Sequence, residues 1–333
     1  MNEEMLDIIE KLNLPSPDSH KGQNGRLLVI GGSTLFHAAS IWSLTVASRI
    51  VDLVHYCSVK ENNKIVHELK KEFRNGIVIP RNHVEEYIQE DDVILIGPGM
   101  VRVTNPKSEY RNPKQFKNTN FQIKNIKQIN EIQDEGEQTY YLTNYLTRKY
   151  PEKQWVIDAG ALQMVELENI PKNAILTPHH QEFELLLSKS QITNHNVQTK
   201  HNNQNSKKIQ SEVGKNFVYP LSKSVEQFAK TYSCTVLLKG KEDVASNGKE
   251  TTIIEGGNAG MTKGGTGDVL AGLIAALACK NDPWTATLAG SYINKRAGDE
   301  LYEKVGPFFN ATDLANQIPV VMKELMSTRL KTR

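Results

Sequence analysis

A glycine-rich loop followed by a single carboxylate is the part of this chain best suited to chemistry. The stretch GGNAGMTKGGTGDVLAGLIAALAC runs from Gly256 to Cys279 and places Asp268 in the first turn of an apolar helix pattern. Glycines allow backbone N–H groups to approach an anion closely, and the free N–H groups at a helix start add to this effect. Asp268 is then either a favourable first-turn acid or a base that deprotonates a hydroxyl as it attacks a phosphoryl group.

The loop differs from two common phosphate-binding patterns. The chain has no G-x-x-x-x-G-K-[ST] of a Walker A loop. No buried parallel strand pattern leads directly into Gly264, as a G-x-G-x-x-G nucleotide fingerprint would require. The loop therefore predicts a phosphate or oxyanion site of another kind.

The elements that must position this loop follow an α/β pattern. Short apolar, β-branched runs without strict alternation indicate strands buried on both faces, and these are RLLVIGG, LVHYCSV, GIVIP, DDVILIGPG, QWVIDAG, AILTP and TVLLKG. Helix patterns cover residues 38–50, 64–73, 139–150, 181–187, 224–232, 268–279, 284–303 and 312–329. Strands that alternate with helices predict a mostly parallel sheet with helices on both sides.

Small, polar or charged residues follow several of these strands. They are Gly31-Gly32-Ser33, Gly97-Pro98-Gly99, Asp158, Thr177-Pro178-His179-His180 with Glu182, and Lys239-Gly240. Ligands of open α/β sheets bind beyond the carboxyl ends of the strands. The joint placement of these residues predicts a site of nucleotide size at that edge.

Three segments depart from the strand–helix pattern. Asn247-Gly248, between two strand-like runs in KEDVASNGKETTIIEG, predicts a β-hairpin with a tight turn. Residues 101–137 and 189–220 are rich in Asn, Gln and Lys, and we expect both to be polar insertions that form exposed loops. His195 and His201 lie in the second insertion, where we expect solvated side chains rather than ligands of metal or nucleic acid.

Composition limits the class of protein. The 40 basic and 38 acidic residues among 333 give a net charge of +2, which offers no electrostatic argument for binding nucleic acid or an acidic membrane. Cys57, Cys234 and Cys279 have no metal-binding spacing, and the first two lie in apolar runs, which favours reduced core residues and a reducing compartment. No apolar run reaches the ~18 residues of a membrane span, and the N-terminal segment lacks the apolar centre of a signal peptide. We expect a cytoplasmic protein that binds small molecules.

The segment GNAGMTKGGTGDVLAG resembles the signature of the ADP/ATP-dependent NAD(P)H-hydrate dehydratases, which belong to the ribokinase-like superfamily. Further similar blocks follow in the family's order, and these are HKGQNGRLLVIGGS, ILIGPGM, VIDAGAL, ILTPHHQEFELLL and LLKGKEDVASNG. The resemblance covers about residues 20–100 and 138–305. Two departures concern the substrate side: the family commonly has a further glycine shortly after Gly-Pro-Gly, where Met100 leads to Val101 and Arg102 here, and a glycine before the alanine, where His37-Ala38-Ala39 stands here.

The resemblance implies a fold and a reaction. The fold is a ribokinase-like three-layer α/β/α architecture with a mostly parallel central sheet, and we expect residues 1–333 to form one such domain. The epimerase domain fused to some relatives is not expected, because residues 1–19 are too few to hold it. The implied reaction repairs the S epimer of NADH hydrate or NADPH hydrate. ADP or ATP phosphorylates the hydroxyl of the hydrated ring, and loss of phosphate restores NADH or NADPH.

The resemblance also implies roles for individual residues. Asp268 matches the catalytic aspartate, and the hydrate-binding positions match Ala39, Gly99, His179 and Asp268. The nucleotide-binding positions match Lys239, Gly240, Lys241, Glu242, Asp243, Asn258, Ala259, Gly260, Met261, Thr262, Lys263, Gly264, Gly265, Thr266 and Gly267. Mg²⁺ is expected because transferred phosphates need charge neutralisation, and Asp158 is a candidate for a supporting or magnesium-related carboxylate. Relatives often assemble into tetramers, so a homo-oligomer is expected.

Two other functions remain open at this point. A ribokinase-like kinase acting on a vitamin precursor or a sugar would share Asp268 and the glycine loop, although it is not expected to combine TPHHQEF, LLKGKED and HKGQNGR. A nucleotide-binding sensor without catalysis would most readily lose Asp268, which is present. The sequence leaves the choices of ADP or ATP, and of NADH hydrate or NADPH hydrate, open.

Overall fold

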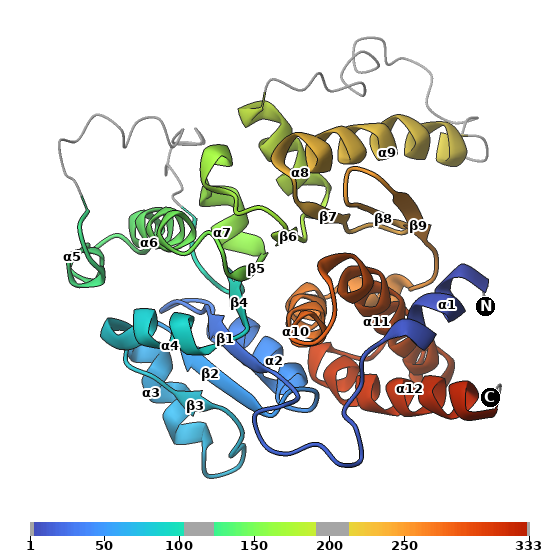
Figure 1. Cartoon of the computed structure of the whole chain (residues 1–333), viewed down its shortest axis with the longest axis horizontal. Coiled ribbons are helices and arrows are strands. Elements are labelled where there is room, and N and C mark those ends of the chain that lie inside the picture. The colour runs from blue at the N-terminus through green and yellow to red at the C-terminus, as the bar shows by residue number, and fades with distance from the viewer. Residues whose placement is uncertain (1–2, 103–122, 191–212, 332–333) are drawn as a thin grey trace.

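A β-sheet with parallel and antiparallel strands forms the centre of the molecule (Figure 1). The computed structural model describes residues 3–102, 123–190 and 213–331. Within these residues the sheet has nine strands in the order β3-β2-β1-β4-β5-β6-β7-β8-β9. They are β1 (Arg26–Ile30), β2 (Leu53–Cys57), β3 (Ile77–Val78), β4 (Val93–Ile96), β5 (Gln154–Ile157), β6 (Ile175–Leu176), β7 (Thr235–Leu238), β8 (Asp243–Ser246) and β9 (Thr251–Ile254). All pairs from β3 to β7 are parallel, and β8 and β9 extend the sheet antiparallel, which confirms the predicted mostly parallel sheet.

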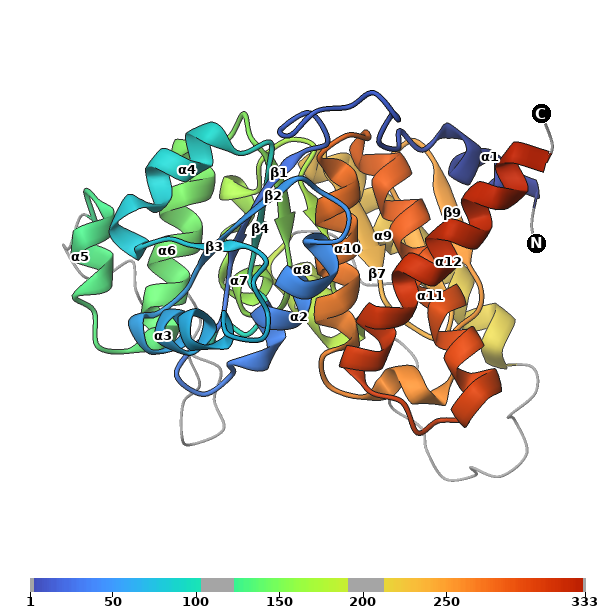
Figure 2. The ribbon, with the colours of Figure 1, turned by 90° about the horizontal axis from the view of Figure 1, so that it is seen from below.

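Helices cover both faces of the sheet, and Figure 2 shows them from a second direction. One layer holds α1 (Glu3–Lys11), α2 (Ala38–Ala47), α3 (Lys60–Leu69), α10 (Thr266–Ala278), α11 (Pro283–Val305) and α12 (Ala311–Lys331). The other holds α4 (Val84–Glu90), α5 (Ile126–Asn130), α6 (Glu135–Lys149), α7 (Ala159–Met164), α8 (His180–Lys189) and α9 (Val213–Tyr232). The three-layer architecture is therefore confirmed.

Alternation along the strands divides the apolar side chains into two cores. Leu27 and Val29 of β1 pack in the core beneath α2 and α10, whereas Leu28 and Ile30 pack in the core on the opposite face. Strand β4 is buried at every position. Strands buried on both faces are typical of parallel sheets, so the continuous apolar runs in the sequence have their expected cause.

Most helices and the hairpin lie where the local sequence patterns predicted them. The helix patterns coincide with α2, α3, α6, α8, α9, α10, α11 and α12, while the shorter α4, α5 and α7 are not among the predicted helices. The hairpin prediction is also confirmed, because β8 and β9 pair antiparallel around Asn247 and Gly248. The Asn247 side chain accepts hydrogen bonds from the backbone N–H groups of Lys249 and Glu250, and Gly248 takes a φ of 80°.

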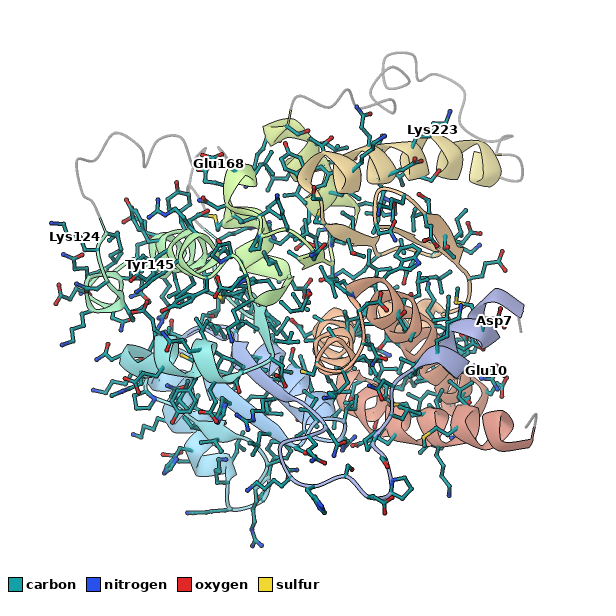
Figure 3. The ribbon with its side chains drawn as sticks, viewed as in Figure 1. Asp7, Glu10, Lys124, Tyr145, Glu168 and Lys223 are labelled. Carbon is teal, nitrogen blue, oxygen red and sulfur yellow. The ribbon has the colours of Figure 1, made fainter. Side chains whose placement is uncertain are left out.

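The prediction that residues 101–137 form an exposed loop is wrong for their last part. Helix α5 buries Ile126 and Ile129, one helical turn apart, against the core under α6. Tyr145 of α6 lies near the segment that carries Lys124 (Figure 3), and its hydroxyl is 3.4 Å from the Lys124 carbonyl oxygen. Likewise, residues 213–220 of the second predicted loop belong to α9. His195 and His201 lie outside the described residues.

Two further expectations concern the cysteines and membranes. Cys57 and Cys234 are buried, which confirms them as core residues, and Cys279 is half-buried. No helix in the described part of the chain combines the length and apolar character needed to span a bilayer.

Candidate active site

The glycine loop ends at a strained position that starts α10. Gly265 is the N-cap residue of α10 and has a φ of 98°, a backbone conformation that side chains other than glycine rarely adopt. A Cβ atom at this position would lie 2.3 Å from the Trp42 ring of α2. The tight contact with Trp42 thus fixes the start of α10, where unpaired backbone N–H groups can face a ligand anion.

Asp268 lies in the first turn of α10 and is half-buried. Ser43 Oγ on α2 donates a hydrogen bond of 2.8 Å to the Asp268 backbone carbonyl, which holds this turn against its neighbour. The Asp268 carboxylate has no ion pair with any described residue. Burial, and then the negative charge of Asp158, raises the pKa of Asp268 to about 7, with Lys239 opposing and Glu182 adding to the rise. A carboxyl group of this pKa can both accept and release a proton near neutral pH.

Lys239 and Asp158 form an ion pair beside Asp268. Lys239 follows β7 and Asp158 follows β5, and Lys239 Nζ is 2.9 Å from Asp158 Oδ1. The same oxygen accepts a hydrogen bond of 2.8 Å from Thr177 Oγ1, after β6. Burial alone would lower the pKa of Lys239, but the neighbouring carboxylates, Asp158 first, raise it, so Lys239 stays charged. Lys239 Nζ is also 3.5 Å from the Cβ position of Gly267, which places the positive charge at the start of α10.

Glu182 and His179 close the start of α8 with a capping box. The His179 backbone N–H donates to Glu182 Oε2 at 2.9 Å, and the Glu182 backbone N–H donates to His179 Nδ1 at 3.3 Å. Gln163 Nε2 donates to the other carboxylate oxygen of Glu182, and Arg102 donates to Gln163 Oε1. The buried Glu182 carboxylate is therefore held in one orientation, while the His179 ring stays half exposed at the site.

A cavity of about 700 Å³ begins at His179 and Lys239 and extends to α11. It is lined by the predicted residues His179, Lys239, Gly240, Lys241, Asp243, Asn258, Ala259, Met261, Thr262, Thr266 and Gly267, together with Gly256, Gly257, Leu270, Asn294 and Lys295. The structure thus brings most of the two predicted nucleotide-binding segments together in one hollow, which His179 and the α11 residues Asn294 and Lys295 complete.

Five predicted nucleotide-binding residues do not line this cavity. They are Glu242, Gly260, Lys263, Gly264 and Gly265. Glu242 is exposed, and the Gly260 Cβ position meets the Phe309 ring at 2.3 Å. Lys263 Nζ turns away to donate to the backbone carbonyl oxygens of Pro307 and Phe309. Gly264 has no atom within 4 Å of its Cβ position, so its backbone is open to a ligand.

Ala39 and Gly99 face each other on the other side of Asp268's helix. A Cβ atom at Gly99 would lie 3.0 Å from Ala39 Cβ and 2.8 Å from the Phe36 carbonyl oxygen, so only glycine fits this φ of 73° and this approach. His37, within the His37-Ala38-Ala39 stretch that departs from the family pattern, is the N-cap residue of α2, and its Nδ1 atom is 3.1 Å from Asn62 Oδ1.

Two buried polar residues of the cavity, both on α11, are not among the residues predicted from the sequence. Asn294 and Lys295 both lie on α11 and are 4% and 5% exposed. Lys295 Nζ donates to the backbone carbonyl oxygens of Gly240, Lys241 and Gly256, and it is 3.3 Å from Asp243 Oδ1. The signal that could have found them is the presence of an amide and a lysine on the buried face of α11, beside Ile293 and Ala297.

The carboxylates of the site suit a magnesium ion that is also bound by the phosphates of the nucleotide. No cluster of three or more His, Cys, Asp or Glu side chains able to hold a metal occurs among residues 3–102, 123–190 and 213–331. Asp158 and Glu182 nevertheless lie close enough to Asp268 for their negative charges to raise its pKa. Mg²⁺ commonly binds through one or two carboxylates plus substrate phosphates, so Asp158 and Glu182 fit this role.

The fold is similar to that of solved structures from one superfamily. A ribokinase-like superfamily protein from Enterococcus faecalis matches with a TM-score of 0.68 at 20% identity, over 96% of this chain and 94% of that one. An ADP/ATP-dependent NAD(P)H-hydrate dehydratase from Bacillus subtilis, co-crystallised with ATP/Mg²⁺, matches with a TM-score of 0.66 at 20% identity, over 96% and 97% of the two chains. The protein therefore has a ribokinase-like fold.

Sequence comparison narrows the class to a family. The family model described as NAD(P)H-hydrate dehydratase matches residues 131–320. The ADP-dependent (S)-NAD(P)H-hydrate dehydratase of Nitrosopumilus maritimus is 32% identical over 92% of this chain and 91% of its own length. The bifunctional NAD(P)H-hydrate repair enzyme Nnr of Methanocaldococcus jannaschii is also 32% identical, and the chain spans about half (51%) of its length. The chain belongs to the NAD(P)H-hydrate dehydratase family.

Proposed function

We propose that this protein catalyses the ADP- or ATP-dependent dehydration of the S epimer of NAD(P)H hydrate to NAD(P)H. The observation that carries the proposal is the position of Asp268, a carboxyl group with a pKa of about 7 at the start of the glycine-loop helix, beside the ion pair of Lys239 and Asp158. Family membership and the cavity formed by the two nucleotide-binding segments support it.

The reaction runs in two steps in this site. Asp268 removes the proton from the ring hydroxyl, whose oxygen attacks the terminal phosphorus of ADP or ATP and releases AMP or ADP. The lone pair of the ring nitrogen then expels phosphate as the C–O bond breaks, and the adjacent carbon loses a proton to restore the double bond. Hydroxide is a poor leaving group, so the nucleotide is consumed to convert it into phosphate.

The remaining residues bind and orient the two substrates. The backbone N–H groups of Gly264 to Gly267 surround the transferred phosphoryl group, and Lys239 offsets part of its charge. Ala39, Gly99 and His179 contact the hydrated ring, and His179 does so from the wall of the nucleotide cavity that it lines. Mg²⁺ bound with the nucleotide would neutralise phosphate charge, and Asp158 and Glu182 are the carboxylates that would help to hold it.

The wider setting of the enzyme is also part of the proposal. We place it in the cytoplasm as a homo-oligomer built from one ribokinase-like domain per chain. Buried, unpaired Cys57 and Cys234 support a reducing compartment. Light scattering of the purified protein checks the oligomer, since a monomer at every concentration would contradict it, and cell fractionation checks the compartment.

Mixing chemically hydrated NADH or NADPH with the protein, Mg²⁺ and either ADP or ATP tests the activity. Recovery of the dihydronicotinamide absorbance that requires the nucleotide supports the proposal. No recovery with either nucleotide, together with ATP-dependent phosphorylation of a vitamin alcohol or a sugar, would instead identify a small-molecule kinase. Separate titrations of ADP and ATP then determine the donor.

A further inference from the structure

The end of the cavity that lies along α11 contains a buried amide oxygen that has no partner in the described part of the chain. Asn294 is 4% exposed, and its Oδ1 atom has no hydrogen-bond partner among the described residues. Asn294 also lines the cavity. A buried acceptor that loses its hydrogen bond to water on folding costs about 1–3 kcal/mol, so a ligand that pairs with it gains correspondingly. The position therefore calls for a ligand with a hydrogen-bond donor.

Lys295, the lysine of α11 at this end of the cavity, is already engaged by protein groups. Lys295, next to Asn294, directs its Nζ atom to the carbonyl oxygens of Gly240, Lys241 and Gly256 and to Asp243. Its donors are thus occupied in joining the two walls of the cavity to α11. A phosphate would instead be drawn to the other end, where Lys239 lies at the start of α10.

Apolar side chains complete the surroundings of Asn294. Leu270 lies one helical turn beyond Thr266 on α10 and lines the cavity with Met261. Met261 itself packs against Gly298 of α11, with its Sδ atom 2.4 Å from the Gly298 Cβ position. A flat apolar ligand with a polar edge suits two apolar walls and one amide better than a sugar or a phosphate does.

We propose that Asn294 reads the nucleobase of the nucleotide co-substrate and selects adenine. An asparagine amide carries one acceptor and one donor, and it can pair with the exocyclic amine of adenine and an adjacent ring nitrogen at once. A half-turn of the amide about its Cβ–Cγ bond exchanges the two atoms, so either can face the base. This inference deepens the proposed function and rests on it: Lys239 and the glycine loop hold the phosphates, and Asn294 recognises the base.

Calorimetric titration with ADP and with IDP tests this assignment, because hypoxanthine carries a carbonyl where adenine carries the amine. Wild-type protein should bind ADP about 10- to 100-fold more tightly than IDP, the scale of one bidentate base contact. Asn294→Leu and Asn294→Ala should reduce this preference to about threefold or less. Asn281→Ala, at the far end of α10, serves as the control and should retain the preference.

Thermal melting without nucleotide separates recognition from a structural role. Both Asn294 variants should melt at or above the wild-type temperature, since they remove an unpaired buried group, and they should lose most of the rise in melting temperature that ADP causes in the wild type. An ADP preference that stays unchanged in both folded variants would overturn the inference and leave the proposed function standing. A wild-type protein that binds no adenine nucleotide would overturn both.

Discussion

Lys239 and Asp158 are joined by a 2.9 Å ion pair across the carboxyl ends of β7 and β5, directly beside Asp268. The two partners act on Asp268 in opposite directions. The positive charge of Lys239 lowers the pKa of the Asp268 carboxyl group, whereas the negative charge of Asp158 raises it. The pair can thus set the pH at which Asp268 becomes a base, without contacting the transferred proton.

Wild-type activity should depend on pH through Asp268. Because the base must be deprotonated and its pKa is about 7, kcat/KM for the hydrate should rise with pH and level off above about pH 8. A pH profile of the repair reaction at saturating nucleotide checks this. A flat profile between about pH 5 and pH 8 would show that a group with an ordinary carboxyl pKa acts instead.

Substitutions in the ion pair should move this profile in opposite directions. Lys239→Met removes a charge that lowers the pKa of Asp268, so the midpoint should move to higher pH. Asp158→Asn removes a charge that raises this pKa, and the midpoint should move to lower pH. Each shift is expected to be about half a pH unit or more, and shifts of the same sign in both variants would contradict the electrostatic coupling.

Asp268→Asn should separate nucleotide binding from turnover. The amide keeps the shape of the side chain but cannot accept the hydroxyl proton, so kcat should fall by two or more orders of magnitude, the usual scale for loss of a general base. Nucleotide affinity, measured by titration, should change by less than about threefold because the phosphate cradle is made by backbone N–H groups. Turnover at the wild-type rate would remove Asp268 from the mechanism.

The same variant should gain stability at high pH. An Asp268 pKa raised from 3.8 to about 7 means that the native state binds more protons than the unfolded state between these values, so wild-type stability falls as pH rises through this window. Asp268→Asn lacks this penalty and should be more stable by up to about 4 kcal/mol near pH 8, with little difference near pH 4. Denaturant unfolding at both pH values measures it, and equal stability at pH 8 would show that the carboxylate is not destabilised by burial.

Alanine substitutions at the neighbouring residues Gly265 and Gly264 should differ in their effect on the start of α10. Gly265→Ala must place a Cβ atom on a residue with a φ of 98° and against the Trp42 ring, so it should lose about 1–3 kcal/mol or more of stability and weaken nucleotide binding. Gly264→Ala meets no neighbouring atom within 4 Å and should fold with wild-type stability. Thermal melting of both variants compares them, and equal melting temperatures would contradict the assigned strain.

Sequence patterns predicted the parallel sheet, the long helices and the hairpin at Asn247-Gly248 because each depends on local periodicity or turn chemistry. Helix α5 was missed because it spans only five residues, Ile126–Asn130, within a stretch rich in Asn, Gln and Lys. Asn294 and Lys295 were not predicted for a different reason. The partners of Lys295 lie 55 and 39 residues away in sequence, at Gly240 and Gly256, and only the packing of α11 brings Lys295 and Asn294 to the cavity.

The central claim is that the ring hydroxyl oxygen leaves the substrate as part of inorganic phosphate. Hydrated NADH labelled with oxygen-18 at this hydroxyl, incubated with the protein, Mg²⁺ and ADP or ATP, tests it directly by mass spectrometry of the released phosphate. One labelled oxygen in each phosphate, formed in equal amount to the recovered NADH, is the predicted result. Label that appears in water, with unlabelled phosphate, would contradict phosphorylation of the hydroxyl and with it the role given to Asp268.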